Sequence, residues 1–202
     1  MYTKLPNLVL AFHGCDLSVF ESVIYKHKHL KNSENDHDWL GHGAYFWEHN
    51  LERAWEWAKD GVNNPKSSIK EPTVIGAIID LGNCLNLMDS QNIKILKKQF
   101  EIFNYEIKYS DTMMPLNKNK SGDNDLLLRY LDCAVIENLH QERKINKQDS
   151  FDSVRGVFFE GNEIYKTSGF REKTHIQICV RNPNCIKGYF VPQSKDSVWS
   201  IP

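Results

Sequence analysis

The sequence predicts an α+β domain with a mostly antiparallel sheet. The chain has 202 residues, 41% of them hydrophobic, which suits one domain with a substantial core. Short strand-like segments alternate with amphipathic helical segments along the chain. At the C-terminal end two strand-like segments, 174–182 and 185–193, follow one another without a helix between them. This succession favours an antiparallel arrangement over a doubly wound parallel sheet.

Periodicity and capping residues predict the individual elements. A compact apolar run closed by glycine predicts a strand over 7–14, and Asp16 is placed to cap the helix that follows. Asn50 is placed to cap a second helix, whose end is expected at Gly61. β-branched residues predict a long strand with a glycine break over 73–87. The other expected elements are a helix over 89–103, a helix over 124–147 capped by Asp123, and strands over 44–48, 154–161, 174–182 and 185–193.

The charge and the cysteines limit the functional classes. Lys and Arg number 25 against 26 Asp and Glu, so the whole chain lacks the basic charge typical of a nucleic-acid binder, although a local basic lobe could still serve. No apolar run reaches the roughly 18 residues of a membrane span, and the N-terminus lacks a convincing secretory signal. The five cysteines include no C-x-x-C pair, which indicates buried thiols in a reducing compartment. The sequence therefore predicts a cytoplasmic protein.

Three common site types are disfavoured by spacing. Histidines and acids crowd residues 27–49, but no H-E-x-x-H motif occurs, and His27 and His29 are too close in sequence to share a helix face. We therefore expect a polar loop and no metal. His13 and Cys15 flank Gly14, but a catalytic cysteine usually lies at a helix N-terminus with its base on another element. No G-x-G-x-x-G or G-K-[ST] loop is present to cradle a phosphate.

The aromatic residues of the segment 39–57 point to a binding site. It holds four of the five tryptophans, most of which we expect in the core. Tyr45 follows a Gly-x-Gly run, and it alternates with Phe46, so the two rings face opposite sides of a strand. A tyrosine ring beside a histidine and a backbone glycine can hold a flat ring that carries an amide.

A strand that ends in His13-Gly14, followed by the Gly-x-Tyr-Phe strand "GHGAYFWE" and a helix, resembles the His-Tyr-Glu class of ADP-ribosyltransferases, which is diphtheria-toxin- and PARP-like. The resemblance implies a split antiparallel sheet and NAD as co-substrate. It implies that His13 binds a ribose of NAD, that the Gly14 backbone holds the nicotinamide amide and that Tyr45 stacks on the nicotinamide ring. The chain would be a single domain over 1–202, in which the poorly matching section at about 89–150 is a helical insertion. The remaining cofactor-binding candidates are Phe46, Trp57 and Arg53, of which Arg53 could reach the NAD pyrophosphate or be an ordinary exposed helix charge.

The third residue of the family motif, a glutamate, is missing. Its position falls on Gln177, or on His175 if the register differs by two, and both side chains would point to one face. A glutamine keeps a hydrogen bond to the ribose 2′-OH but supplies neither charge nor a general base. A carboxylate nearby could replace it, or Gln177 is an ordinary strand residue. The candidate carboxylates are Glu160, Glu163 and Glu172.

The loop 160–173 corresponds in position to the segment that meets the acceptor in this family. Its Tyr165, Lys166, Phe170 and Arg171 suit phosphate contact and base stacking, and the alternative is a solvated loop with two buried anchors. The segments 33–48 and 174–190 are also similar to a bacterial group that includes the mRNA-modifying toxin of a phage-defence toxin–antitoxin–chaperone system. That similarity implies a mono-ADP-ribosyltransferase toxin with RNA as acceptor and an antitoxin or chaperone partner. The alternatives are a transferase acting on protein, an NAD glycohydrolase and a non-catalytic module that binds NAD or ADP-ribose.

Overall fold

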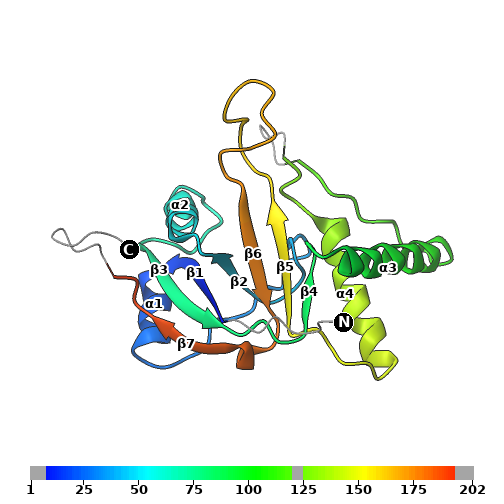
Figure 1. Cartoon of the computed structure of the whole chain (residues 1–202), viewed down its shortest axis with the longest axis horizontal. Coiled ribbons are helices and arrows are strands. Elements are labelled where there is room, and N and C mark those ends of the chain that lie inside the picture. Colours follow the sequence, from blue (N-terminus) through cyan, green and yellow to red (C-terminus); the bar gives the residue numbers. More distant parts are fainter. Residues whose placement is uncertain (1–7, 120–124, 194–202) are drawn as a thin grey trace.

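Seven strands form one sheet in the computed structural model, which describes residues 8–119 and 125–193 (Figure 1). The strands are β1 (Val9–Asp16), β2 (Ala44–Glu48), β3 (Pro72–Ile79), β4 (Cys84–Asn86), β5 (Ser153–Phe158), β6 (His175–Val180) and β7 (Ile186–Phe190). Their order in the sheet is β4-β5-β6-β2-β1-β3-β7. Among these seven described strands only β4 and β5 pair in parallel, so the expectation of a mostly antiparallel sheet in an α+β fold is confirmed.

Four α-helices flank the sheet, and two of them begin at the predicted caps. The Asp16 side chain accepts a hydrogen bond from the backbone N–H of Ser18 at 3.0 Å, and that of Asn50 accepts one from the N–H of Arg53 at 3.0 Å. Figure 1 places α1 and α2 around β1 and β3, with α3 and α4 at the β4 end of the sheet. The helices are α1 (Leu17–Ile24), α2 (Leu51–Val62), α3 (Ser90–Lys108) and α4 (Tyr130–Ile145), and a 3₁₀ turn, η1 (Pro183–Cys185), precedes β7.

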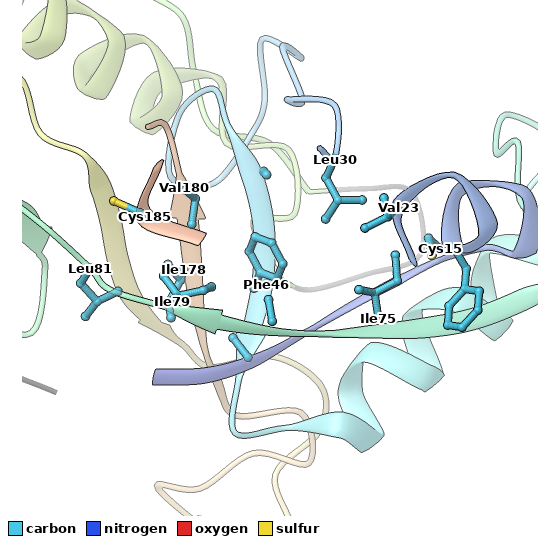
Figure 2. Packing of buried hydrophobic residues seen from close by; sticks show 14 residues of the cluster. Cys15, Val23, Leu30, Phe46, Ile75, Ile79, Leu81, Ile178, Val180 and Cys185 are labelled. Atoms are coloured by element: carbon cyan, nitrogen blue, oxygen red, sulfur yellow. The ribbon is translucent and has the colours of Figure 1, made fainter. Parts of the chain in front are cut away.

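Strand alternation sends side chains to two apolar faces of the sheet. On one face, α1 packs against a cluster that includes Phe46, Ile75 and Ile178, all completely buried (Figure 2). On the other face, Leu139 of α4 and Ala54 of α2 belong to two smaller clusters. The sheet is therefore covered on both sides, and each of its central strands contributes to both faces.

The long strand expected over 73–87 is two separate strands. The chain turns at Gly82, whose φ of +60° favours glycine, and the backbone N–H of Asn83 donates to Asp152 Oδ2 at 2.8 Å. Beyond this turn β4 joins β5 at the opposite end of the sheet from β7, whereas β3 lies beside β7. The β-branched run was continuous in sequence, but the two halves pair with different partners.

Helix α4 begins later than the capping pattern predicted. Its expected cap, Asp123, lies outside the described residues, and the helix starts at Tyr130. The side-chain oxygen of Asn117 accepts hydrogen bonds from the backbone N–H groups of Leu131, at 2.9 Å, and Asp132, at 3.3 Å. A residue distant in sequence thus supplies the cap.

Candidate functional site

The sheet opens between β1 and β2 beside His13 and Gly14. The register of β1 with β2 ends at the pair Phe12 and Trp47. β1 nevertheless stays paired with β3 along its whole length, and β2 stays paired with β6 as far as Ala44. Figure 2 shows β1 running on toward α1 while β2 runs in another direction past Phe46. The two central strands therefore separate where the sequence placed its site.

The His13 imidazole bridges this opening. Its Nδ1 lies 2.7 Å from the backbone carbonyl oxygen of Tyr45. A carbonyl only accepts, so Nδ1 carries the proton and donates it in this bond. Burial of the ring lowers the pKa of His13, and the bond to Tyr45 raises it by less. The ring is therefore neutral at pH 7, and its Nε2 is left as a hydrogen-bond acceptor.

The backbone of Gly14 is directed toward the opening. The Leu10 carbonyl accepts from the His49 N–H at 3.0 Å across the β1–β2 pair. In an antiparallel ladder every second residue turns its N–H and C=O to the same neighbour, so those of Gly14 also point to the β2 side. Gly14 lies two residues beyond Phe12, where the pairing ends. Its polar backbone groups consequently face the place where the strands separate.

Close packing of α2 by itself explains why residue 14 is a glycine. A Cβ at this position would lie 2.2 Å from the carbonyl oxygen of Ala54 and 3.2 Å from the Cβ of Ala58. Ala54 and Ala58 of α2 therefore pack closely against β1 at this point. The glycine therefore does not need a ligand to account for it.

Tyr45 and His13 project to opposite faces of the sheet. The Tyr45 ring packs against the α4 cluster, and its hydroxyl donates to the Gly41 carbonyl at 2.6 Å and accepts from the Leu40 N–H at 2.8 Å. Burial raises the pKa of Tyr45 far above its usual range, so the hydroxyl stays protonated. Phe46 alternates with Tyr45, as predicted, and lies 5.8 Å from the His13 ring, between ring centroids. Phe46 is completely buried, so it is a core residue and not a wall open to a ligand.

Gln177 and His175 point to one face, as the sequence predicted, and the structure shows that it is the face of Tyr45. Gln177 pairs with Trp47 of β2, and His175 pairs with Phe158 of β5. The His175 side chain is completely buried, with its Nδ1 2.6 Å from the Lys173 carbonyl. Burial lowers the pKa of His175 to about 4, so the ring is neutral at pH 7. It lies among three aromatic rings, Trp39, Trp47 and Phe158, at centroid distances of 6.2, 6.4 and 5.9 Å.

Arg53 is buried in an ion-pair network, so its interpretation as an exposed helix charge is wrong. Its side chain is 9% exposed, and its two terminal nitrogens contact Glu56 Oε2 at 2.6 Å and Glu160 Oε2 at 3.0 Å. The same Glu160 oxygen lies 3.9 Å from Nδ1 of His175. Arg53 thus joins α2 to the chain between β5 and β6, beside the His175 face.

Of the three candidate carboxylates, only Glu160 is brought to that face. Glu163 accepts a hydrogen bond from the backbone N–H of Thr167 at 2.9 Å, within its own loop. Glu172 accepts from the backbone and side chain of Asn162, both at 3.3 Å. The sequence offered all three equally, because their proximity depends on how the loop 160–173 folds back.

The aromatic residues of the loop 160–173 face solvent. Tyr165 is 61% exposed and Phe170 64% exposed, so the alternative of a loop with two buried anchors is wrong. Lys166 is also exposed, whereas Arg171 Nη1 pairs with Asp125 Oδ1 at 2.6 Å. Trp57, on α2, is half-exposed, with its ring 5.7 Å from that of Trp47.

The part of the chain that the structure describes contains no group of three or more His, Cys, Asp or Glu side chains arranged to hold a metal ion. Within the same residues, no helix is both long and apolar enough to cross a membrane. All five cysteines are free thiols.

Comparison with known proteins gives one distant relative. The chain is 26% identical over 195 residues to the uncharacterized protein MJ0359 of Methanocaldococcus jannaschii, and the similarity covers 87% of this chain and 83% of that protein. No family model matches the sequence, and no solved structure matches it.

Proposed function

We propose that this protein is an NAD-dependent ADP-ribosyltransferase that binds NAD at the opening between β1 and β2. The observation that carries the proposal is the His13 imidazole, held across the opening by the Tyr45 carbonyl in its neutral form. The His13 side chain bonds the Tyr45 carbonyl just beyond the point where backbone pairing of β1 with β2 ends. A histidine that only stabilised the core would not need to take the place of a backbone hydrogen bond between two central strands. The resemblance of "LAFHGCD" and "GHGAYFWE" to the His-Tyr-Glu class supports the same site.

The residues around the opening suit the parts of NAD in different ways. Nε2 of His13 can accept a hydrogen bond from a ribose hydroxyl, because the ring proton stays on Nδ1, which donates to the Tyr45 carbonyl. The N–H and C=O of Gly14 match the acceptor and donor of a carboxamide. The Tyr45 hydroxyl is tied to residues 40 and 41, which fixes its ring in orientation. That ring packs against the α4 cluster on the face opposite His13, so Tyr45 contributes to the opening through its backbone carbonyl, which orients His13.

The negative charge that the reaction needs is assigned to Glu160. NAD supplies the ADP-ribosyl group: the bond from C1′ to nicotinamide breaks with its electron pair leaving on nicotinamide, and C1′ bonds to the acceptor nucleophile, whose proton goes to solvent. Positive charge develops on the ribose as that bond breaks, and a fixed carboxylate stabilises it. Gln177, on the face opposite His13, can offer a hydrogen bond to a ribose hydroxyl but has no charge. Glu160 pairs with Arg53 at 3.0 Å and lies 3.9 Å from His175, on the face that Gln177 occupies.

The second candidate function is a non-catalytic module that binds NAD or ADP-ribose. The observation that favours it is the uncharged Gln177 in the position of the family glutamate, together with the pairing of Glu160 to Arg53, which neutralises part of its charge. Both functions use the same opening in the sheet, so they differ only in whether nicotinamide is released.

Nicotinamide release from NAD by the purified protein tests the proposal. We expect release by the wild type, and a loss of at least about a hundredfold in His13→Ala, because a ribose contact and its positioning are removed. The matched control is His37→Ala, a change in the polar loop before β2. Nicotinamide release that survives His13→Ala unchanged would show that the site is assigned wrongly. Binding of NAD without release would favour the non-catalytic module.

A further inference from the structure

The turn after α1, residues 25–31, carries a local concentration of positive charge. No Asp or Glu occurs in residues 22–33, although the whole chain has a formal net charge of -1. The helix does not account for this charge, because α1 ends at Ile24 with no basic residue in its last turn, and the attraction of a helix dipole falls off beyond that turn. The basic turn holds three lysines and two histidines, all of them exposed: Lys26, Lys28, Lys31, His27 and His29.

The three lysines of the basic turn have no counter-charge. Within residues 8–119 and 125–193, none of them forms an ion pair with a carboxylate. By contrast, Arg53, Arg155 and Arg171 are each paired. Cations gathered without partners repel one another, and a bound anion relieves that repulsion. The basic turn is therefore suited to an anionic ligand.

His27 stands where a glycine is usual. Its φ of +54° is in the left-handed region, and the Lys28 N–H donates to the Ser22 carbonyl at 3.2 Å. A six-to-one hydrogen bond around a left-handed residue is the Schellman ending of a helix, and glycine is the residue that takes this conformation without strain. The chain therefore keeps an imidazole at this position at a cost in free energy. Strain of this kind gathers at functional sites.

The basic turn is anchored to the body of the domain. Leu30 is buried beside Val23 of α1 (Figure 2), and its N–H donates to the Tyr189 hydroxyl of β7 at 3.3 Å. The ring of His29 lies 6.4 Å from the ring of Tyr189, between centroids. The charges of the turn are thus held in place before a ligand arrives, which lowers the entropy lost on binding.

An exposed aromatic ring stands at the start of the basic turn. Tyr25 is 67% exposed, and its ring meets that of Phe20 edge-on, at a centroid distance of 6.0 Å and an interplanar angle of 81°. Single-stranded nucleic acids are bound by basic side chains on their phosphates and by aromatic rings stacked on their bases. An acidic protein would need the lysines but not the ring. The combination therefore favours a single strand over an acidic protein surface.

We propose that the basic turn binds single-stranded nucleic acid, with its lysines on the phosphates and the Tyr25 ring stacked on a base. The turn lies on the face of the sheet to which His13 projects, because Leu30 and Phe46 belong to one buried cluster and Phe46 contacts the His13 ring. The inference does not depend on the proposed function, since binding requires neither NAD nor group transfer.

Fluorescence anisotropy of a labelled, unstructured RNA of about 16 nucleotides, long enough to fill a single-strand site, tests the inference. We expect binding at about 50 mM salt that weakens steeply as the salt concentration rises, because lysines on phosphates release counterions. In Lys26→Ala/Lys28→Ala/Lys31→Ala the affinity should fall about tenfold or more. The slope of log affinity against log salt concentration should become less steep by about 2, since each phosphate contact on a single strand contributes about 0.7.

A second triple variant controls for the loss of charge. Lys94→Ala/Lys97→Ala/Lys98→Ala removes the same charge from three exposed lysines of α3. Its affinity for the RNA should stay within about twofold of wild type, because these side chains lie on another helix. Equal losses of affinity in the two triple variants would overturn the proposal, because binding would then follow the total charge of the chain.

Two single variants distinguish a binding surface from an ordinary solvated turn. Tyr25→Ala should weaken RNA binding about fivefold or more, because stacking on one base is lost. His27→Gly should weaken it about twofold or more, because an exposed ring beside the phosphates is lost. The same change should leave the midpoint of urea unfolding unchanged or higher, because glycine relieves the left-handed strain. RNA affinity unchanged in both variants would overturn the assignment of a base-stacking surface.

The remaining outcomes concern the kind of ligand. Single-stranded DNA of the same sequence is a second probe, and its binding also supports the proposal, because phosphates and bases are common to both strands. Displacement of the RNA by poly-glutamate at equal charge concentration would overturn it, and so would the absence of binding at about 50 mM salt. Nicotinamide release should be unchanged in all of these variants, so a failure of this inference is distinguished from a failure of the proposed function.

Discussion

Replacing Gly14 with alanine should test the packing at the centre of the site. The added Cβ would lie 2.2 Å from the carbonyl oxygen of Ala54, well inside the separation at which two such atoms come into contact. The obstructing atom belongs to the backbone of α2, so no side-chain rotation relieves the overlap. The N-terminal half of the helix must move outward by roughly 1 Å, and the surrounding core resists such a shift.

The expected cost of Gly14→Ala is about 2–3 kcal/mol of unfolding free energy. Overpacking a well-packed core costs about 1–3 kcal/mol, and a fixed backbone obstacle belongs near the top of that range. The lower entropy of alanine in the unfolded chain returns about 0.4–1 kcal/mol of stability, which brings the net cost below the maximum.

Urea unfolding of Gly14→Ala and of the matched variant Gly188→Ala measures this cost. Gly188 lies in β7, and a Cβ there would meet nothing within 4 Å, so this variant should be neutral or more stable by up to about 1 kcal/mol. Equal stability of the two variants would refute the reasoning, because it would mean that α2 does not press on β1 at this point.

Three further changes test other parts of the account. Glu160→Gln should lower the unfolding free energy by about 2–3 kcal/mol, because buried Arg53 then lacks a full counter-charge. The control Asp60→Asn, in an exposed pair with Lys173, should cost less than about 0.5 kcal/mol in the same urea titration. Burial lowers the pKa of His140 to about 4 from a usual value of 6.5, so the unfolded chain binds a proton that the folded chain excludes, and stability should fall as the pH drops from 6.5 toward 4. Between pH 7 and 5 His140 alone should lower the unfolding free energy by about 2 kcal/mol, and this loss should disappear in His140→Phe. An unchanged dependence of the unfolding free energy on pH in that variant would contradict the burial of a neutral ring. Tyr45→Phe leaves the Leu40 N–H and the Gly41 carbonyl without their hydroxyl partner, so it should lower the unfolding free energy by about 1–2 kcal/mol. The control Tyr105→Phe, at an exposed tyrosine, should leave the unfolding free energy unchanged. Equal stabilities of the two variants would argue against the two hydrogen bonds.

Local signals in the sequence predicted the elements whose causes are local. Asp16 and Asn50 cap helices because a side-chain oxygen next to a free backbone N–H needs no distant partner. The break at Gly82 and the cap of α4 by Asn117 depend on contacts between distant segments. Strand propensity could not show that the residues after Gly82 pair with a different strand, because propensity does not specify the partner.

The same distinction applies to the candidate site. The alternation of Tyr45 and Phe46 followed from strand geometry, and so did the shared face of His175 and Gln177. The bond from His13 to a backbone carbonyl was not predictable, because it depends on where two strands stop pairing. Burial of Arg53 and the choice of Glu160 among three carboxylates required the fold of a loop.

The most direct test of the central claim is nitrogen NMR of the His13 imidazole while NAD is added at pH 7. The account predicts a neutral ring with its proton on Nδ1, because Nδ1 donates to the Tyr45 carbonyl and burial lowers the pKa. Addition of NAD should then move the Nε2 resonance to a new position, while Nδ1 keeps its proton. A charged ring at pH 7, or an Nε2 resonance that does not respond to saturating NAD, would contradict the assignment of the opening between β1 and β2 as an NAD site.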